Sequence, residues 1–223
     1  MTKSTAIIFD LDGTLVDSVR DLMEAMNDVL RELSRPTHAL DAYRRFVGDG
    51  ARMLVARARG EPAEDDAVDE ALARFRRRYL AALTVHTAPY PGVEATLAAV
   101  RERGVPSAVL TNKPHDAAVQ VVTHYFPGHP FVAVFGQHQG VPRKPHPGAA
   151  LGLARMFARR PSEVAFLGDS DVDMATAKAA GMRALGAAWG LRGRAELESA
   201  GAEHVLEAPE EVLAHLTGQA ERG

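Results

Sequence analysis

Residues 7–18 read IIFDLDGTLVDS, in which a short apolar run ends in two carboxylates, a glycine and a hydroxyl. The segment over residues 6–9 is brief and fully apolar, as is typical of a buried parallel strand. Asp10 follows directly, at the carboxyl end of the strand, where open α/β sheets bind their ligands. Because side chains two residues apart in an extended segment share a face, we expect Asp10 and Asp12 to point into one cavity.

The residue types of this segment suit two kinds of chemistry. Two carboxylates in one small site can hold a hard divalent cation such as Mg²⁺, or they can act as a nucleophile and a general acid or base. Gly13 can bring its backbone amide close to a ligand. Alternatively, Asp-Gly marks a turn and the acids cap the next helix, but this interpretation does not explain why one acid directly ends the strand.

Composition narrows the class of protein. The chain has 223 residues, of which 46% are hydrophobic and 25% charged, enough for one sizeable core and a small extra domain. The formal net charge of −3 lacks the basic signature of nucleic-acid binding. Cysteine is absent, which excludes disulfides and thiolate metal sites. The first apolar run is too short for a signal peptide, and no other run could span a bilayer, so we expect a cytoplasmic protein without a membrane partner.

Helical patterns without an intervening strand follow the first strand. They cover residues 17–33, 37–48, 51–59 and 63–83. Ser18 or Asp17 can cap the first of these helices, and Asp49 can cap the third. Four consecutive helices predict a bundle-like unit that is inserted after the first strand.

The pattern changes after residue 88, where short apolar strands begin to alternate with helices. The predicted strands cover residues 106–110, 131–135, 164–167, 183–188 and 204–206. Such alternation predicts a doubly wound, Rossmann-like parallel sheet. We therefore predict an α/β core made of residues 1–16 and 87–223, with an α-helical unit of residues 17–86 inserted into it.

Two further segments place polar residues beyond the first strand. Residues 111–113, Thr-Asn-Lys, follow an apolar pair, and a hydroxyl with exposed amides at a helix start can cradle an anion. Helix capping by Thr111 explains the tripeptide equally well. Lys144 lies in a loop that Pro145 and Pro147 restrict, which would hold its cation in place.

A second apolar strand ends in acids at residues 166–173, FLGDSDVD. Asp169 and Asp173 are four residues apart and can share a helix face. Negative charge also suits a helix N-terminus, but we favour metal binding because Asp169 ends its strand as Asp10 ends the first one. Asp171 is interpreted as surface charge at the start of the helix.

Together these segments resemble the four motifs of the haloacid dehalogenase superfamily of phosphotransferases. Asp-x-Asp-Gly-Thr is met by residues 10–14, the hydroxyl after a strand by Thr111, the lysine by Lys144, and Gly-Asp-Ser-x-x-Asp by residues 168–173. The motifs occur in order across nearly the whole chain. The helical insertion resembles the small cap of the phosphoglycolate phosphatase-like subfamily, as do residues 17–18, 48–52, 111–113 and 143–145.

The resemblance implies a Mg²⁺-dependent phosphatase that acts on a small phosphate monoester, with 2-phosphoglycolate as the expected substrate. Asp10 would be the nucleophile that forms an aspartyl-phosphate. Asp12 would protonate the leaving alcohol and then activate water. The phosphate would be bound by Gly13, Thr111, Asn112 and Lys144.

The resemblance also implies a metal site and a cap. Mg²⁺ would be bound by Asp10, the backbone carbonyl of Asp12 and Asp169. Asp173 would act indirectly or through water, and would restrain Lys144. The cap would close over the site. Its candidate specificity residues are Arg45, Gly50 and Arg52, since a cap arginine could pair with the carboxylate of glycolate; the alternative for the arginines is a solvated, charge-balanced helix surface. His86, His115 and His146 are interpreted as structural or solvent-facing.

Several related activities stay open at this point. A phosphomutase of the β-phosphoglucomutase type, a pyrophosphatase, a nucleotidase or a sugar-phosphate phosphatase would share all four motifs, and a non-catalytic phosphate-binding member is a further alternative. Dehalogenation is disfavoured, because dehalogenases of this superfamily lack the second acid, and Asp12 is present. A phosphate-accepting receiver domain would be shorter and would lack the helical insertion. The oligomeric state is expected to be monomer or homodimer.

Overall fold

A parallel sheet of six strands forms the centre of the molecule. The computed structural model describes residues 3–217. The strand order is β5-β4-β1-β6-β7-β8, and each pairing in this sheet is parallel. The strands are β1 (Ala6–Phe9), β4 (Ser107–Pro114), β5 (Val134–Gln137), β6 (Val164–Gly168), β7 (Arg183–Ala187) and β8 (His204–Leu206). The predicted α/β fold class is therefore confirmed.

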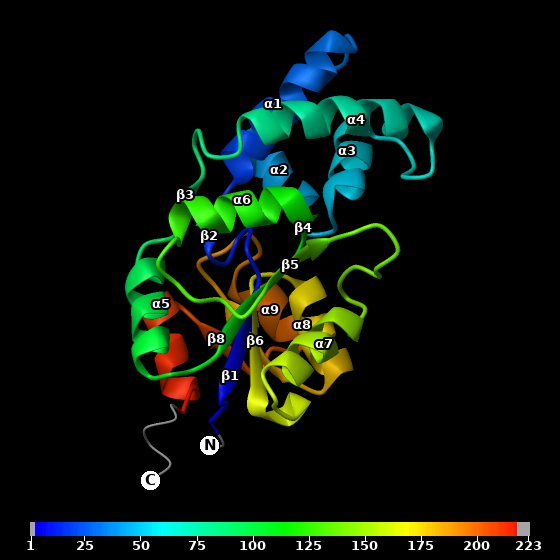
Figure 1. Ribbon diagram of the computed structural model, residues 1–223. Coiled ribbons are helices and arrows are strands. Elements are labelled where there is room, and N and C mark those ends of the chain that lie inside the picture. The colour runs from blue at the N-terminus through cyan, green and yellow to red at the C-terminus, as the bar shows by residue number, and fades with distance from the viewer. Residues whose placement is uncertain (1–2, 218–223) are drawn as a thin grey trace.

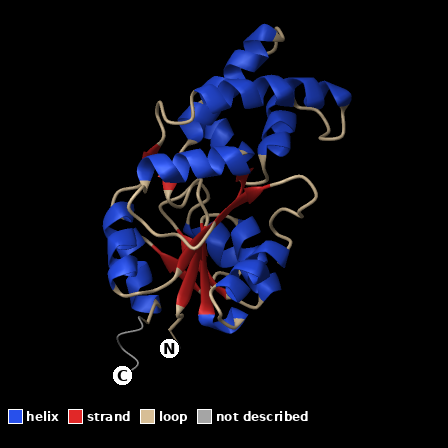
Figure 2. Cartoon of the chain, viewed as in Figure 1, coloured by secondary structure: helices blue, strands red, loops and turns tan. Residues whose placement is uncertain are grey.

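Helices cover both faces of the sheet (Figure 2). One face packs against α5 (Val93–Glu102), α6 (His115–Tyr125) and the 3₁₀ helix η2 (Pro209–His215). The other packs against α7 (Gly148–Met156), α8 (Asp171–Ala180) and α9 (Arg194–Ala200), and a short 3₁₀ helix, η1 (Pro161–Glu163), leads into β6. Within β1, Ile7 and Phe9 contact the first layer, and Ile8 contacts the second. Burial on both faces explains why this strand is apolar without alternation.

A unit of helices lies over the carboxyl ends of the strands (Figure 1). It contains α1 (Val19–Glu32), α2 (Leu40–Phe46), α3 (Ala51–Arg59) and α4 (Asp66–Ala81). The chain enters it through β2 (Val16–Asp17) and returns through β3 (Ala88–Pro89), and these two short strands pair antiparallel. The helical unit therefore sits above the edge of the sheet where α/β proteins bind ligands.

A buried carboxylate on α1 holds the returning chain. Asp21 accepts hydrogen bonds from the backbone N–H of His86 at 2.9 Å, and from the backbone N–H of Thr87 at 2.8 Å and its hydroxyl at 2.7 Å. A carboxylate with several donors is well stabilised when buried. These bonds fix the point where the helical unit rejoins the sheet, a contact that sequence patterns did not predict.

Local predictions at three positions need correction. Residues 111–113 belong to β4, and not to a helix start, because β4 continues to Pro114, which pairs with Gln137 of β5. Ser18 does not cap α1 through its side chain, since its hydroxyl donates to Asp12. The N-cap of α3 is Gly50, while the carboxylate of Asp49 pairs with Arg57 at 2.5 Å. In each case a tertiary or ion-pair contact replaces the local capping contact.

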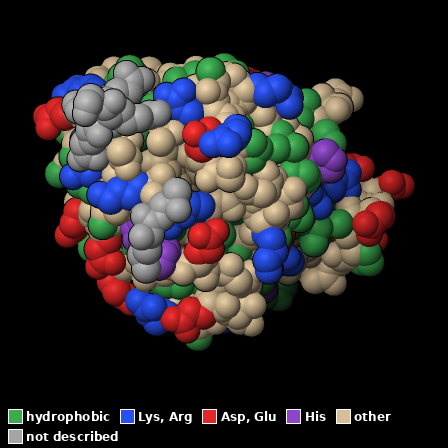
Figure 3. All heavy atoms as spheres, turned by 90° about the horizontal axis from the view of Figure 1, so that it is seen from below, with side chains coloured by type: hydrophobic (Ala, Val, Ile, Leu, Met, Phe, Trp, Pro, Cys, Tyr) green, Lys and Arg blue, Asp and Glu red, His purple; other side chains and the backbone are tan. Residues whose placement is uncertain are grey.

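The helices and the surface charge bear on two classes of partner, membranes and nucleic acids. Within residues 3–217, none of the helices has both the length and the apolar character needed to cross a membrane. On the face of the molecule opposite the helical unit, basic and acidic side chains are interspersed (Figure 3). That face offers no extended surface of one sign of charge such as nucleic acid requires.

Candidate active site

The candidate site lies where three neighbouring strands end. Phe9 of β1 is in register with Val109 of β4 on one side and Leu167 of β6 on the other. Asp10 follows β1, and its backbone N–H donates to the carbonyl of Leu167 at 2.9 Å. The register of the sheet thus brings Asp10 beside the end of β6, where Asp169 lies.

Three buried carboxylates meet at this edge. Ligand oxygens of Asp10, Asp169 and Asp173 all lie within 4.8 Å of one another. Burial, together with the negative charge of Asp173, raises the pKa of Asp10 to about 7. Burial, Asp173 and Asp10 likewise raise the pKa of Asp169 well above its ordinary value. Like charges held this close are unfavourable without a cation, so the cluster is suited to binding one.

A divalent cation fits the cluster only if some of its carboxylate oxygens are not already occupied by hydrogen-bond donors. Lys144 Nζ lies 2.9 Å from Asp10 Oδ1 without hydrogen-bond geometry, so this buried oxygen has no hydrogen-bond donor among the described residues. Asp169 accepts the backbone N–H of Leu191 at 2.8 Å. Asp10 and Asp169 therefore keep lone pairs for a metal, and their hard oxygens suit Mg²⁺.

Asp173 is fully engaged by protein groups. One of its oxygens lies 2.6 Å from Lys144 Nζ, and the other accepts the hydroxyl of Ser170 at 2.6 Å. Burial disfavours the charge on Lys144, but Asp10 and Asp173 outweigh this effect and raise its pKa. Asp173 thus holds the lysine, which is compatible with an indirect role toward a metal.

The carboxylate of Asp12 lies outside this cluster and faces the cavity. It accepts the hydroxyl of Ser18 at 2.5 Å and pairs with Lys113 at 2.8 Å. This leaves the backbone carbonyl as the part of Asp12 that could serve a metal. The side chain is not needed for the metal and can take the acid–base role that the motif predicts.

Two glycines let loops approach Asp169 closely. Gly13 has φ +86°, and a Cβ there would lie 2.2 Å from Asp169 Oδ2. A Cβ on Gly190 would lie 2.3 Å from the Cβ of Asp169 and 2.4 Å from the carbonyl oxygen of Gly13. Sequence analysis missed Gly190 and Leu191. Their position just after β7, at the same edge of the sheet, is the signal that could have indicated them.

The side chains of Thr111 and Asn112 have different partners. The hydroxyl oxygen of Thr111 accepts the backbone N–H of Lys113 at 3.2 Å, so its proton remains available for a ligand. Asn112 accepts the backbone N–H of Lys144 at 2.9 Å and donates to the carbonyls of Lys144 and Gly48. Asn112 therefore ties the lysine loop to the helical unit.

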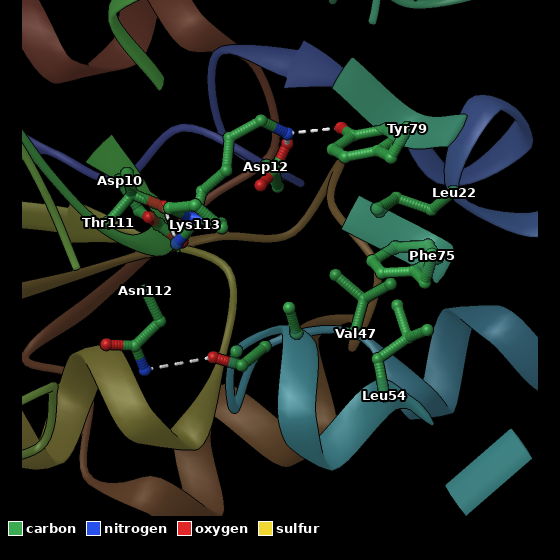
Figure 4. Close-up of a pocket in the computed structure, with 14 residues that line it drawn as sticks. Asp10, Asp12, Leu22, Val47, Leu54, Phe75, Tyr79, Thr111, Asn112 and Lys113 are labelled. Atoms are coloured by element: carbon green, nitrogen blue, oxygen red, sulfur yellow. Dashed lines mark hydrogen bonds and ion pairs between the residues drawn. The ribbon is translucent and has the colours of Figure 1, made fainter. Parts of the chain in front are cut away.

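A cavity separates the strand ends from the helical unit (Figure 4). The sheet contributes Asp10, Asp12, Thr111, Asn112, Lys113 and Pro114 to its lining. The helical unit contributes Leu22, Val47, Gly48, Gly50, Ala51, Leu54, Phe75 and Tyr79. One wall is thus polar and carries the acids, and the facing wall is mostly apolar.

The predicted specificity residues are not all brought to this cavity. Gly50 lines it, with φ +86°. Arg52 instead pairs with Asp69 and lines a second, outer cavity. Arg45 is exposed and lines neither cavity.

The three histidines are engaged elsewhere. His86 pairs with Glu24, with 3.2 Å between the nitrogen and the carboxylate oxygen. The ring of His115 contacts that of His138 at a tilt of 35°, and His146 accepts the backbone N–H of Gly148.

The order and geometry of these motifs match a known family. A sequence model of the haloacid dehalogenase-like hydrolases matches residues 5–181. The chain belongs to the haloacid dehalogenase-like hydrolase family. The four motifs of this family are those that place Asp10, Thr111, Lys144 and Asp169 at the edge of the sheet.

Individual known proteins are similar to this one over most of the chain. A phosphoglycolate phosphatase from Pseudomonas putida is 39% identical over 194 residues, which cover 85% of this chain and 71% of the relative. A haloacid dehalogenase-like hydrolase from Streptococcus pneumoniae superposes with a TM-score of 0.86 at 26% identity, covering 96% of this chain and 99% of that one. CbbY from Rhodobacter sphaeroides, solved in complex with phosphate, gives a TM-score of 0.78 at 26% identity, with coverage of 96% and 99%.

Proposed function

We propose that this hydrolase is a Mg²⁺-dependent phosphatase that acts on a small phosphate monoester, with 2-phosphoglycolate as the expected substrate. The observation that carries the proposal is the meeting of Asp10, Asp169 and Lys144 beneath the helical unit. The similarity to the phosphoglycolate phosphatase from Pseudomonas putida supports the choice of substrate. In this proposal the enzyme works in the cytoplasm, as a monomer or a homodimer.

Asp10 is the proposed nucleophile. Its carboxylate oxygen attacks phosphorus and forms an acyl-phosphate bond while the bond from phosphorus to the leaving oxygen breaks. Lys144, whose ammonium lies 2.9 Å from Asp10, offsets charge on the phosphate oxygens. The hydroxyl of Thr111 and backbone amides of the loop after β1 and of Asn112 donate to the same oxygens. The amide of Gly13, which sequence analysis assigned to the phosphate, instead donates to the carbonyl of Val16 at 2.9 Å.

Asp12 is the proposed acid and base. It gives its proton to the leaving oxygen in the first step and takes a proton from water in the second. That water attacks phosphorus, inorganic phosphate leaves, and the carboxylate of Asp10 is restored. Ser18 and Lys113 hold the Asp12 carboxylate in the lining of the cavity, where the proposed leaving group would lie against the helical unit.

A divalent cation fits the residues beside the nucleophile. Asp10, the backbone carbonyl of Asp12 and Asp169 would hold it, with Asp173 acting through Lys144. When bound, the cation reduces the repulsion between the anionic nucleophile and the phosphate dianion. Its positive charge would also offset the unfavourable burial of negative charge on Asp10 and Asp169, whose pKa values are raised.

The helical unit of residues 17–86 is proposed to act as a cap. Core side chains donate hydrogen bonds to three consecutive carbonyls of its loop: Arg192 to Val47 at 2.9 Å, Asn112 to Gly48 at 3.1 Å and Arg143 to Asp49 at 3.0 Å. These bonds hold the cap against the sheet and keep bulk water from the acyl-phosphate.

The test is phosphate release from a panel of esters with Mg²⁺ and with EDTA. The panel contains 2-phosphoglycolate, sugar phosphates, nucleotides and pyrophosphate. The proposal expects Mg²⁺-dependent release that is fastest from 2-phosphoglycolate, and none from the Asp10→Asn variant. Asp171→Asn is the matched control, because Asp171 is an exposed acid at the start of α8. Full activity in EDTA or in Asp10→Asn would refute the mechanism.

A further inference from the structure

We propose that Lys113 is the specificity-determining residue of this site and that it pairs with a carboxylate on the leaving group of the substrate. The inference rests on the proposed phosphatase function and deepens it, since it names acidic leaving groups as the substrate class. In the mechanism above Lys113 only contacts Asp12. Its position gives it a second use.

Lys113 joins the sheet to the helical unit and lines the cavity between them. Its side chain is only 2% exposed, and its ammonium donates to Asp12 Oδ1 at 2.8 Å. It also donates to the hydroxyl oxygen of Tyr79 on α4, and the ammonium lies 4.7 Å from the centre of that ring. Figure 4 shows this contact across the cavity. A leaving group that is protonated by Asp12 must therefore lie beside Lys113.

Two hydrogens at this point remain available for an anion. An ammonium has three N–H donors, and the described contacts use two of those of Lys113. Tyr79 accepts from Lys113, so its own hydroxyl hydrogen can donate to a ligand. Burial raises the pKa of Tyr79 to about 12, which keeps the hydroxyl protonated. Burial opposes the charge on Lys113, but Asp12 and Tyr79 outweigh it and raise its pKa, so the group remains cationic.

Lys113 is also the one cation among the described residues that line this cavity. The facing wall is apolar at Leu22, Val47, Leu54 and Phe75. Lys144 and the proposed cation act at Asp10, on the phosphate side of the site, so an acidic leaving group beside Asp12 depends on Lys113 for its attraction. The apolar wall offers such a group no second polar partner.

The cap arginines do not offer the same contact. Arg52 donates to the backbone carbonyl of Ala63 and pairs with Asp69, and Arg45 is exposed. Neither lines the cavity that holds the nucleophile. The carboxylate recognition that sequence analysis assigned to a cap arginine is therefore better met by Lys113, which comes from the sheet.

The experiment compares two esters that differ in one group. In 2-phosphoglycolate the leaving group carries a carboxylate, and in 2-hydroxyethyl phosphate a neutral hydroxymethyl takes its place. Steady-state kinetics are measured for the wild type, Lys113→Met, Tyr79→Phe and the control Lys178→Met, which removes an exposed lysine on α8. Any effect of Lys113 through Asp12 falls on both esters alike, so the ratio of their kcat/KM values isolates carboxylate recognition.

Lys113→Met is expected to lower this ratio about 100-fold, mainly through a higher KM for 2-phosphoglycolate. Tyr79→Phe, which keeps the ring, is expected to lower it about fivefold, and Lys178→Met should leave it unchanged. Circular dichroism melts check that each variant is folded. If Lys113→Met is not folded, the change of the ratio in Tyr79→Phe serves as the test.

Two results overturn the assignment of Lys113 while the phosphatase function stands. One is an equal loss on both esters, which would make Lys113 a positioning residue for Asp12. The other is a wild type that hydrolyses both esters equally well. A wild type that releases phosphate from neither ester or from any member of the wider panel would overturn the proposed function, and the assignment with it.

Discussion

The ammonium of Lys144 lies 2.6 Å from the carboxylate of Asp173, and both side chains are buried. We propose that Asp173 affects the reaction through this lysine. The Asp173→Asn variant keeps the shape of the side chain but removes its charge. We expect kcat to fall about 10- to 100-fold, because the lysine loses its restraint, and the Mg²⁺ concentration for half-maximal activity to change.

Steady-state kinetics over a Mg²⁺ titration measure both kcat and this Mg²⁺ concentration. The exposed Asp171→Asn variant is the control, and identical behaviour of the two variants would rule out this role.

The hydrogen bond from Arg192 to the carbonyl of Val47, 2.9 Å long, leads to a second prediction about cap closure. Arg192 also donates to the carbonyl of Arg45 at 3.4 Å. Arg192→Ala should lower kcat/KM about tenfold, since both bonds from this charged donor are lost from the closed state. Backbone amides of residues 48–51 should then exchange hydrogen faster. Arg194→Ala provides the matched control, because Arg194 lies on the same segment but pairs with Glu207 and Glu198. Unchanged exchange in Arg192→Ala would show that this bond does not hold the cap.

Close packing at Gly190 leads to a third prediction. The added Cβ of Gly190→Ala would lie 2.3 Å from the Cβ of Asp169, so the loop or the carboxylate must move. We expect a loss of about 1–3 kcal/mol in the free energy of unfolding and weaker Mg²⁺ binding. Chemical denaturation and isothermal titration calorimetry with Mg²⁺ measure the two effects.

Gly152→Ala is the control for this steric effect. A Cβ at that helical position meets only the end of Arg155, at 3.8 Å, so the variant should be as stable as the wild type or slightly more stable. If Gly190→Ala matches Gly152→Ala in its free energy of unfolding and in Mg²⁺ binding, the close contact between Gly190 and Asp169 contributes to neither.

Histidine burial predicts how stability depends on pH. His129 contacts the hydroxyl of Ser107 at 2.7 Å, and burial, aided by the positive charge of Arg101, lowers its pKa to about 4 from 6.5. Between these values the unfolded chain binds more protons at this histidine than the folded one, so His129 contributes a fall in the free energy of unfolding as pH decreases from 6.5 toward 4. Asp10 and Asp169, whose pKa values are raised, contribute in the opposite direction, so the histidine is isolated by comparison with a variant: thermal melts of His129→Asn should lose less stability, or gain more, than the wild type over this pH range. Parallel curves would contradict the prediction.

The strand ends were the most predictable part of the site. Residues 6–9 and 164–167 are short apolar runs that stop at an acid, and a parallel sheet must bring such ends to one edge. The fold class and the family follow from the same pattern and are confirmed. The proximity of Asp10 to Asp169 needs no information beyond the order of the strands.

Contacts between side chains far apart in the sequence were not predictable from local patterns. Lys113 was recognised only as part of the Thr-Asn-Lys tripeptide, and its contact with Tyr79 of α4 had no sequence signal. Gly190 shows no signal until β7 is placed next to β6. Arg52 of α3 was a candidate for substrate contact, with a charge-balanced helix surface as the alternative, and its ion pair with Asp69 of α4 fits the alternative. Such choices depend on tertiary packing, which sequence periodicity does not encode.

The nucleophilic role of Asp10 is the central claim, and trapping its covalent product tests it most directly. Asp12→Asn enzyme is mixed with Mg²⁺ and p-nitrophenyl phosphate, whose leaving group needs no proton, then quenched in acid and analysed by peptide mass spectrometry. Without its base the variant should retain one phosphoryl group on Asp10, and the Asp10→Asn, Asp12→Asn double variant should retain none. Release of nitrophenol with no adduct, or with the adduct on another residue, would contradict the account.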